Sequence, residues 1–336
     1  MHKNDKIKVA VIGLGKQALE DHIPAVLASN DTELCAVVDQ DEEKIKSFHT
    51  RYPDIPGFTN FDICLKEQNI NLVIIALPHN VHCQIAEKAI KNGIHVLKEK
   101  PFAISLSEVR RIAKLAKENH VKVGVTLQRR FNPIYSNFPQ FIDKIGRPFY
   151  INIKYTFYTD SPGTGWRGQK KLAGGGCLID MGYHMIDLLM WYFGLPDQIL
   201  MYMNNNGNEH QQYDAEDTAH VMFKYKNQNI GGSMLISRVL PPKQEFINVY
   251  GTRGIINLER GKIERCLPNG KLKESLQWQE NCPSAVVDQL EYFVKVIRGE
   301  KENIASPELH LKHLAFIEAA YKSAEEEKFI NPLNLL

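Results

Sequence analysis

Short apolar runs alternate with stretches of helical spacing through the first third of this chain, and no other feature constrains its fold as strongly. The apolar runs lie at residues 9–12, 34–38, 72–76, 94–97 and 121–125, and the helical stretches lie near 16–29, 41–51, 60–68, 80–92 and 105–119. Runs rich in Val, Ile and Leu, without polar alternation, are typical of strands buried on both faces of a parallel sheet. Strand and helix repeating in this way predict an α/β domain over residues 1–125, a doubly wound parallel sheet with right-handed crossovers.

The pattern changes beyond Phe131-Asn132-Pro133, where strand-like segments follow one another. Five such segments lie at residues 150–158, 218–225, 230–236, 245–250 and 254–258, and helical apolar spacing lies at 177–193, 285–297 and 309–325. The turn-forming sequences at 226–229 and 251–254 suit antiparallel hairpins. We therefore predict a second domain, of α+β class, over residues 126–336.

The balance of charge argues against a large anionic partner. The 336 residues include 41 basic and 39 acidic side chains, a net charge of +2. This balance calls for neither nucleic acid nor a membrane surface. No segment has the uninterrupted apolar length of a membrane span, and the start of the chain leaves no room for a signal peptide. The six cysteines form no C-x-x-C pair, which favours a reducing, cytoplasmic compartment. We expect a small-molecule substrate.

The sequence Gly13-Leu14-Gly15-Lys16-Gln17-Ala18 follows the first apolar run and opens the first helix. It matches the G-x-G-x-x-A pattern of dinucleotide-binding turns. Gly13 would permit the tight turn, Gly15 would let a pyrophosphate approach the backbone, and Ala18 would keep helix and strand close. The N-terminus of the helix would then face the phosphates.

Asp39 ends the second apolar run, about twenty residues further on, where a carboxylate binds the hydroxyls of the adenosine ribose. Its charge would repel a 2′-phosphate, so NAD is favoured over NADP as the cofactor. Alternatively, Asp39 only caps the helix that begins near Asp41, since aspartate is common at such positions.

Two further turns should reach the same edge of the sheet. Leu77 and Pro78 follow the run 72–76 and are expected beside the nicotinamide ribose, while His82 either joins them or lies on the surface of the next helix. Lys100 follows the run 94–97 and precedes a proline. Judged alone, such a lysine is usually solvated. Because open parallel sheets bind ligands at the carboxyl ends of their strands, we take Lys100 as a candidate site residue.

A second dense motif begins at the run Gly174-Gly175-Gly176, which suggests that something approaches the backbone closely. Asp180 and His184 are four residues apart and Asp187 is three further on, so they share one face if the segment is helical. An ordinary surface ion pair would also account for Asp180 and His184. We expect no metal, because no further His or Cys cluster lies nearby.

Taken together, several motifs resemble one known family. They are Gly13-x-Gly15-x-x-Ala18, Glu99-Lys100-Pro101, Gln128-Arg129-Arg130-Phe131-Asn132-Pro133, Trp166-Arg167, and Gly174-Gly175-Gly176 leading to Asp180-x-x-x-His184. In order and spacing they are similar to the glucose-fructose oxidoreductase, inositol dehydrogenase and MocA (Gfo/Idh/MocA) family over nearly the whole chain. The resemblance implies an N-terminal Rossmann domain and a C-terminal domain built on a large, mostly antiparallel open sheet. It also implies a homodimer or homotetramer assembled through that sheet.

The resemblance implies catalytic roles for Lys100, Asp180 and His184. Oxidising a secondary alcohol requires removal of the hydroxyl proton while hydride leaves the same carbon. An imidazole, which titrates at about pH 6.5, suits that proton transfer. His184 would take the proton, Lys100 would donate to the same oxygen, and Asp180 would hold a neighbouring hydroxyl or orient the pair. The lysine and the histidine could exchange roles.

The resemblance also implies binding residues. The expected cofactor-binding set is Gly13, Gly15, Lys16, Gln17, Ala18, Asp39, Leu77, Pro78, His82, Glu99, Lys100 and Gln128. The expected substrate-binding set is Arg129, Trp166, Arg167, Asp180 and His184. The two arginines suit a carboxylate or phosphate, although structural salt bridges would explain them equally well. Trp166 either stacks on a sugar or simply packs.

These expectations favour an NAD-dependent dehydrogenase acting on CH–OH groups, which interconverts a secondary hydroxyl and a ketone on a sugar, aminosugar, cyclitol or nucleotide-sugar. Two alternatives stay open. One is a redox-neutral enzyme of the NAD-dependent glycosidase type, in which bound NAD is reduced and reoxidised within one cycle. The other is a non-catalytic dinucleotide-binding regulator, since fold does not fix function. A regulator has less reason to keep the lysine, aspartate and histidine together.

Overall fold

The computed structural model describes residues 5–279 and 284–336, and the chain forms two compact units. The first unit comprises Met1–Ala103, Ser107–Gln128 and Asn281–His310. The second comprises Ile104–Leu106, Arg129–Glu280 and Leu311–Leu336. The chain therefore returns to the first unit after most of the second has been built.

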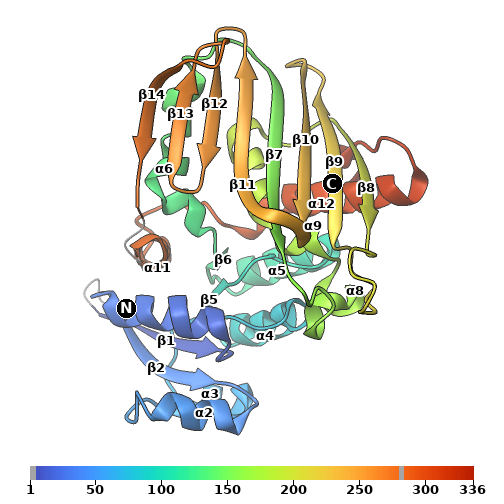
Figure 1. The fold of residues 1–336 in the computed structure, drawn as a ribbon. Coiled ribbons are helices and arrows are strands. Elements are labelled where there is room, and N and C mark those ends of the chain that lie inside the picture. The colour runs from blue at the N-terminus through green and yellow to red at the C-terminus, as the bar shows by residue number, and fades with distance from the viewer. Residues whose placement is uncertain (1–4, 280–283) are drawn as a thin grey trace. The chain divides into compact units, whose positions relative to one another are not determined.

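A six-stranded parallel sheet forms the centre of the first unit (Figure 1). Its strands are β1 (Ile7–Ile12), β2 (Thr32–Val38), β3 (Gly57–Phe58), β4 (Leu72–Ile75), β5 (His95–Lys98) and β6 (Val123–Val125). They pair in the order β3-β2-β1-β4-β5-β6, and each neighbouring pair is parallel. This is the Rossmann order, so the predicted doubly wound sheet is confirmed. The short strand β3 was not predicted, because Gly57 and Phe58 make no apolar run.

Five α-helices follow these strands in the chain: α1 (Ile23–Ala28), α2 (Glu42–His49), α3 (Phe61–Glu67), α4 (His79–Lys91) and α5 (Leu106–Glu118). The first predicted helix is wound in two parts, because a π-helix, η1 (Ala18–His22), precedes α1. Pro24 lies in the first turn of α1, where its missing N–H leaves the preceding turn without a regular partner. The π-helix carries His22 into the interior, where it is 3% exposed.

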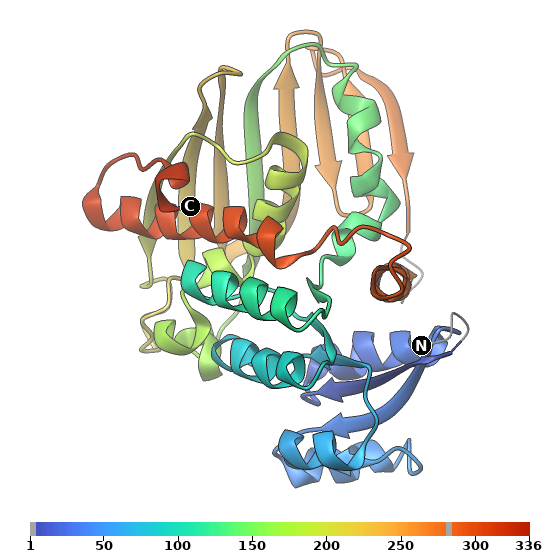
Figure 2. The same cartoon turned by 180° about the vertical axis from the view of Figure 1, so that it is seen from behind.

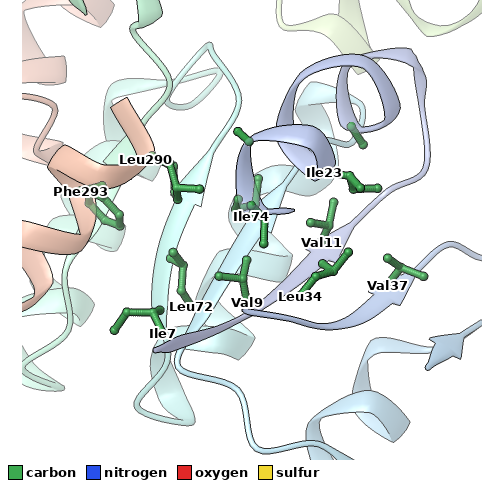
Figure 3. Packing of buried hydrophobic residues seen from close by; sticks show 14 of the residues in the cluster. Ile7, Val9, Val11, Ile23, Leu34, Val37, Leu72, Ile74, Leu290 and Phe293 are labelled. Carbon is green, nitrogen blue, oxygen red and sulfur yellow. The ribbon is translucent and has the colours of Figure 1, made fainter. Parts of the chain in front are cut away.

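A helix from far along the chain packs on this sheet. α11 (Ser284–Ile297) follows the second sheet in sequence, and its position in the chain assigned it to the second domain. In the structure, Leu290 and Phe293 pack with Val9 in the buried cluster of the first unit (Figure 3). Phe293 lies so close to β6 that a Cβ on Gly124 would be 2.7 Å from its ring. The assignment of α11 by chain order was wrong, because burying its apolar face decides where the helix packs.

An eight-stranded sheet forms the centre of the second unit (Figure 1). Its strands are β7 (Pro148–Tyr158), β8 (Gln198–Asn204), β9 (Thr218–Tyr225), β10 (Ile230–Ser237), β11 (Val239–Gly251), β12 (Gly254–Glu259), β13 (Lys262–Cys266) and β14 (Leu272–Gln277). They pair in the order β14-β13-β12-β11-β7-β10-β9-β8; β7 and β10 are parallel, and the other pairs are antiparallel. Both predicted hairpins are confirmed, joining β9 to β10 and β11 to β12.

The remaining helices are α6 (Pro133–Ser136), α7 (Phe138–Ile142), α8 (Lys170–Ala173), α9 (Cys177–Asp180), α10 (Tyr183–Phe193) and α12 (Pro307–Glu326), with 3-10 turns η2 (Gln128–Phe131), η3 (Gly165–Gly168) and η4 (Pro332–Leu335). Figure 2 shows α6, α10 and α12 on one face of the second sheet. The other face carries Tyr150, Tyr202 and Met222, which are 40%, 67% and 48% exposed. None of the described helices combines the length and apolar character needed to cross a membrane.

Candidate active site

The turn after β1 has the form that a dinucleotide requires. Gly13 has φ of +97°, and a Cβ there would be 2.4 Å from the carbonyl oxygen of Ala76, so only glycine fits. Gly15 is different, because a Cβ on it would meet no atom of residues 5–279 or 284–336 within 4 Å. Packing does not demand glycine at that position, and the open space beside its backbone is what a pyrophosphate needs. Ala18 is fully buried, which brings the following helix close to the sheet.

The two polar residues of this turn lie at the surface. Lys16 is 83% exposed, with its Nζ 3.8 Å from a carboxylate oxygen of Glu20. Gln17 is also exposed and hydrogen-bonds to the Asp21 carboxylate. Their side chains are loosely held, so their expected contact with the cofactor stays a prediction.

Asp39 follows β2 directly and is 7% exposed. Its Oδ2 accepts the N–H of Leu14 at 2.8 Å and lies 3.2 Å from Nζ of Lys44, and its Oδ1 accepts the N–H of Asp41 at 3.0 Å. Burial alone would raise the pKa of Asp39, but these two N–H groups and Lys44 outweigh it and lower that pKa. The cap of α2 is the side chain of Asp41, which accepts from Glu43. Asp39 is therefore free of the capping role that was its alternative explanation.

The turn after β4 is supported from inside the unit. His82 is 1% exposed, and its Nε2 lies 2.6 Å from the carbonyl oxygen of Leu77. Burial holds the pKa of His82 well below its ordinary value, so the ring is neutral. The surface position considered for His82 was wrong, because the ring faces inward and fixes the turn that carries Leu77 and Pro78.

The turn after β5 is anchored by two buried side chains. Nε2 of His22 lies 2.7 Å from Oε1 of Glu99, and although burial alone would raise the pKa of Glu99, the hydrogen bond from His22 outweighs it and lowers that pKa. Lys98 is fully buried, and its Nζ donates to the carbonyl of Phe102. This bond spans the turn that presents Lys100, which is half-buried.

Sequence reasoning missed His22 and Lys98. Lys98 had a recognisable signal, because a polar side chain on a strand buried on both faces must find a partner inside the protein. His22 lies in an apparently ordinary helix, and only its inward orientation in η1 gives it a role.

Together these turns line one edge of one sheet. The glycine turn, Asp39, Leu77, Lys100 and Gln128 follow the carboxyl ends of β1, β2, β4, β5 and β6, five strands that are neighbours in the order β2-β1-β4-β5-β6. Gln128 adds a buried amide oxygen with no hydrogen-bond partner among the described residues. Ligands of open α/β sheets bind at this edge.

In the second unit, side-chain and backbone atoms of other segments lie against the backbone of the glycine run. A Cβ on Gly175 would be 2.0 Å from the hydroxyl of Tyr321, and a Cβ on Gly176 would be 2.0 Å from the carbonyl oxygen of Glu216. Oε1 of Glu216 accepts both the Tyr321 hydroxyl at 2.9 Å and the N–H of Leu178 at 3.0 Å. The close approach expected at this run is therefore made by Glu216 and Tyr321, neither of which the sequence singled out.

The segment from Asp180 to His184 is not one continuous helix. Asp180 ends α9, two residues intervene, and His184 lies in the first turn of α10. A Cβ on Gly182 would be 2.3 Å from the carbonyl oxygen of Leu178, which explains the glycine in this break. The single helix predicted over 177–193 was wrong at this point. Within the described parts of the chain, no three His, Cys, Asp or Glu side chains gather as a metal site.

Arg167 lies beside Asp180. Its Nε donates to Oδ2 of Asp180 at 3.2 Å, and its guanidinium stacks on Trp166 with 4.3 Å between Cζ and the ring centroid. The side chain of Arg167 is 54% exposed, and that of Asp180 is 10% exposed. The structure thus brings together three of the five predicted substrate-binding residues.

Behind His184, α10 is fixed by a buried charge network. Asp187 accepts two hydrogen bonds from Arg130, at 2.6 and 3.0 Å, and lies 3.0 Å from Nε2 of His313. Asp187 had been placed on the polar face with Asp180 and His184, but it is 2% exposed and serves to hold the helix.

The side chain of Arg129 is enclosed by other residues and is not directed to solvent. Its Nη2 lies 3.0 Å from Oε1 of Glu245, and the rings of Tyr135 and Tyr155 flank the guanidinium. Arg129 therefore makes a structural salt bridge, which is one of the two roles that the sequence left open.

Two family models match the chain. One describes an oxidoreductase family with an NAD-binding Rossmann fold and matches residues 7–127, and the other describes the C-terminal domain of the same family and matches residues 142–257. The chain belongs to the Gfo/Idh/MocA family. It is therefore an NAD(P)-binding oxidoreductase with a Rossmann unit followed by the family's second sheet, as the motifs implied.

Individual Gfo/Idh/MocA proteins resemble the chain to different extents. Oxidoreductase P35 of Formosa agariphila is 30% identical over 226 residues, which cover 65% of this chain and 70% of the relative. The scyllo-inositol 2-dehydrogenase (NADP(+)) IolW of Bacillus subtilis is 24% identical over 98% of this chain and 96% of its own length. The structure of the WlbA dehydrogenase from Bordetella pertussis, in complex with NADH and UDP-GlcNAcA, matches with a TM-score of 0.81 and 21% identity, over 97% of this chain and 98% of that one.

Proposed function

We propose that this chain is an NAD-dependent dehydrogenase that interconverts a secondary hydroxyl and a ketone on a sugar, aminosugar, cyclitol or nucleotide-sugar. The observation that carries the proposal is the position of Lys100, at the sheet edge that also carries the glycine turn and Asp39. A cation at this edge suits a substrate oxygen beside a bound dinucleotide. The names of two relatives support the substrate class: one is an inositol dehydrogenase, and the other was solved with a nucleotide-sugar.

NAD is the cofactor that the first unit fits. The open space at Gly15 admits a pyrophosphate, and Asp39 is ionised and placed to accept from ribose hydroxyls. When bound, NAD supplies the hydride acceptor. The charge of Asp39 disfavours the 2′-phosphate of NADP, but Lys44, 3.2 Å away, offsets part of that repulsion. We therefore expect a preference for NAD rather than strict exclusion of NADP.

The catalytic residues divide the work of alcohol oxidation. His184 takes the hydroxyl proton, while Lys100 donates a hydrogen bond to the same oxygen and stabilises its developing negative charge. Asp180, whose Oδ2 accepts from Arg167, binds a neighbouring hydroxyl through its carboxylate. With the proton on His184 and a hydride acceptor supplied by bound NAD, the products would be a ketone and NADH.

The experiment follows the formation of NADH while NAD is offered with inositols, aminosugars, free sugars and nucleotide-sugars. Lys100→Ala and His184→Ala should each lower turnover by about a hundredfold or more, with the affinity for NAD largely unchanged. Lys122→Ala and His220→Ala are matched controls, because both side chains are exposed and neither is in the proposed site. A near-wild-type rate in either catalytic variant contradicts the mechanism. Reduced cofactor that never leaves the protein during turnover favours the redox-neutral alternative.

We also propose that the enzyme is cytoplasmic and works as a homo-oligomer. The uncovered face of the second sheet, with Tyr150, Tyr202 and Met222 exposed, is the surface that supports self-association. Sedimentation of the purified protein as a monomer at working concentration contradicts this part of the proposal.

A further inference from the structure

Three arginines near the proposed substrate site have different surroundings. Arg129 and Arg130 are engaged in buried ion pairs, and their side chains are 14% and 9% exposed. The side chain of Arg167 is 54% exposed. A ligand from solvent can therefore reach Arg167 more readily than the other two.

The guanidinium of Arg167 uses only part of its hydrogen-bonding capacity. Its Nε donates to Asp180, and its plane rests on Trp166. The two terminal nitrogens make no hydrogen bond to any residue in 5–279 or 284–336. An arginine fork presents parallel N–H groups that match two oxygens of a carboxylate or a phosphate. Because Asp180 and Trp166 already restrain the side chain, little of its freedom remains to be lost on binding.

The backbone under Arg167 is also held in place. Nη1 of Arg238, a side chain that is 5% exposed, donates to the carbonyl oxygen of Arg167 at 3.3 Å. The carbonyl oxygen of Gly168 accepts the N–H of Asp214 at 3.2 Å. A Cβ on Gly168 would be 2.2 Å from the carbonyl oxygen of Gly163, so the loop is closed tightly on itself. These contacts hold the loop that carries Arg167 from two sides, so the backbone of Arg167 has a fixed position.

The charge around Arg167 also favours an anion. Residues 165–173 contain Arg167, Lys170 and Lys171 and no acidic side chain. Asp180 pairs with Arg167, and the carboxylate of Asp214 accepts the backbone N–H of Lys170 at 2.6 Å, so three cationic side chains face two carboxylates and the segment keeps an excess of positive charge. A neutral sugar would gain nothing from that field.

On the basis of the proposed function, we propose that the substrate is an anionic sugar whose carboxylate or phosphate binds the terminal nitrogens of Arg167. Asp180 then binds a hydroxyl beside the anionic group. Arg167 is the residue that determines specificity, because a neutral sugar leaves its fork unpaired while a charged one satisfies it. Carboxylate and phosphate offer the same chemistry to the fork, and the test separates them.

The first experiment compares sugars that share a ring and differ in the group at C6, which is neutral or anionic. Glucose, galactose, mannose and N-acetylglucosamine, each with its uronate and its 6-phosphate, are titrated into NADH-saturated protein by calorimetry. At least one charged member should bind about tenfold or more tightly than its neutral parent. A preference for uronates identifies a carboxylate, and a preference for 6-phosphates identifies a phosphate. Equal affinity for charged and neutral members, or no binding by any charged member, overturns the proposal.

Variants of the fork test its part in that preference. Arg167→Ala should lower the affinity for the charged sugar by about tenfold to a hundredfold and change the neutral parent little. Arg167→Lys keeps the charge without the fork and should recover only part of the loss. Lys171→Ala is the matched control, since it removes an equal charge from the same segment. A loss in Lys171→Ala as large as that in Arg167→Ala assigns the effect to the general field and overturns the role of the fork.

Turnover, measured separately as NADH formation, distinguishes this inference from the proposed function. Tight binding of charged sugars by Arg167 with no NADH formed from any sugar contradicts the dehydrogenase and supports the anion site. NADH formed with equal efficiency from charged and neutral sugars supports the dehydrogenase and overturns the anion site.

Discussion

The two units hold their site residues by different means. In the first, the candidate cofactor residues occupy turns at the ends of adjacent strands, and backbone contacts set the positions of Gly13 and Asp39. In the second, α10 is positioned through Asp187 by Arg130 and His313, whose side chains come from distant segments. Backbone contacts at a turn do not depend on any one distant side chain, whereas a charge network depends on each of its charged side chains. Changes far from the site should therefore disturb the second unit more than the first.

The largest effect is expected from breaking the network behind α10. Arg130→Met leaves the buried carboxylate of Asp187 without its two-pronged partner and should lower the free energy of unfolding by about 3–5 kcal/mol. Arg147→Met, at an exposed arginine of the same unit, should change it little. Denaturant titration at neutral pH measures both, and equal stability of the two variants would mean that the network does not hold the unit.

The same network predicts a dependence on pH. Burial alone would raise the pKa of Asp187, but Arg130 and His313 outweigh it and hold that pKa below its ordinary value. A carboxyl whose pKa is lowered by folding stabilises the protein above its unfolded pKa of about 4, and this stabilisation is lost as the pH falls. The gap between wild type and Arg130→Met should therefore be smaller at about pH 3 than at neutral pH. An unchanged gap speaks against the ion pair as its source.

The packing of α11 on the first unit should contribute nearly as much to the free energy of unfolding. Phe293→Ala removes a ring that packs against Gly124 and should lower the free energy of unfolding by about 3 kcal/mol or more. Lys295→Ala, on the exposed side of α11, is the control. If thermal melting shows no difference between these variants, the packing of α11 on the first unit contributes little.

Substitutions at one glycine in each unit should affect different properties of the protein. Gly176→Ala drives a methyl group into the backbone of Glu216 and should cost about 1–3 kcal/mol of stability. The methyl group of Gly15→Ala comes within 4 Å of none of the described atoms, so this variant should keep the wild-type melting temperature while weakening NAD binding, measured by fluorescence titration. Wild-type affinity for NAD in Gly15→Ala removes the argument that the open space at this turn holds a pyrophosphate.

The smallest effect concerns Lys44, which is 47% exposed beside Asp39. Lys44→Ala should change stability by about 0–1 kcal/mol, as for other exposed ion pairs. It should weaken NADP binding more than NAD binding, because the carboxylate of Asp39 then repels the 2′-phosphate without compensation. Lys46→Ala, whose lysine pairs with Glu43 instead, should leave the ratio of the two affinities unchanged.

The sequence predicted what periodicity and turn residues encode. The first sheet, five strands of the second, both hairpins and the glycine turn follow from patterns that extend over a few residues, whereas the large open form of the second sheet came from the family resemblance. β8, β13 and β14 were not predicted, and β14, with the sequence Leu272-Lys273-Glu274-Ser275-Leu276-Gln277, mixes polar and apolar side chains on a strand with little buried surface. The packing of α11 on the first unit depends on contacts across more than a hundred residues, for which no local pattern exists.

Part of the candidate site was likewise beyond local reasoning. The motif spacing identified Asp180 and Arg167, but not that one neutralises the other. Gly182 lies in the break between α9 and α10, where a Cβ would be 2.3 Å from the carbonyl oxygen of Leu178, and helical periodicity does not reveal this break. The buried partners His22, Glu216 and Tyr321 become visible only when distant segments are brought together.

Because Lys98 is buried, its chemical modification can report when the turn after β5 opens. Lys98 and Lys100 lie two residues apart, so one peptide carries both amines, yet the first is inaccessible and the second is half-buried. An acylating reagent applied to the native protein should therefore modify Lys98 only in molecules whose β5 turn has come loose. Mass spectrometry would follow the fraction of that peptide modified at both lysines. The rate at which this fraction grows would measure how often the β5 turn opens, with no label added to the chain.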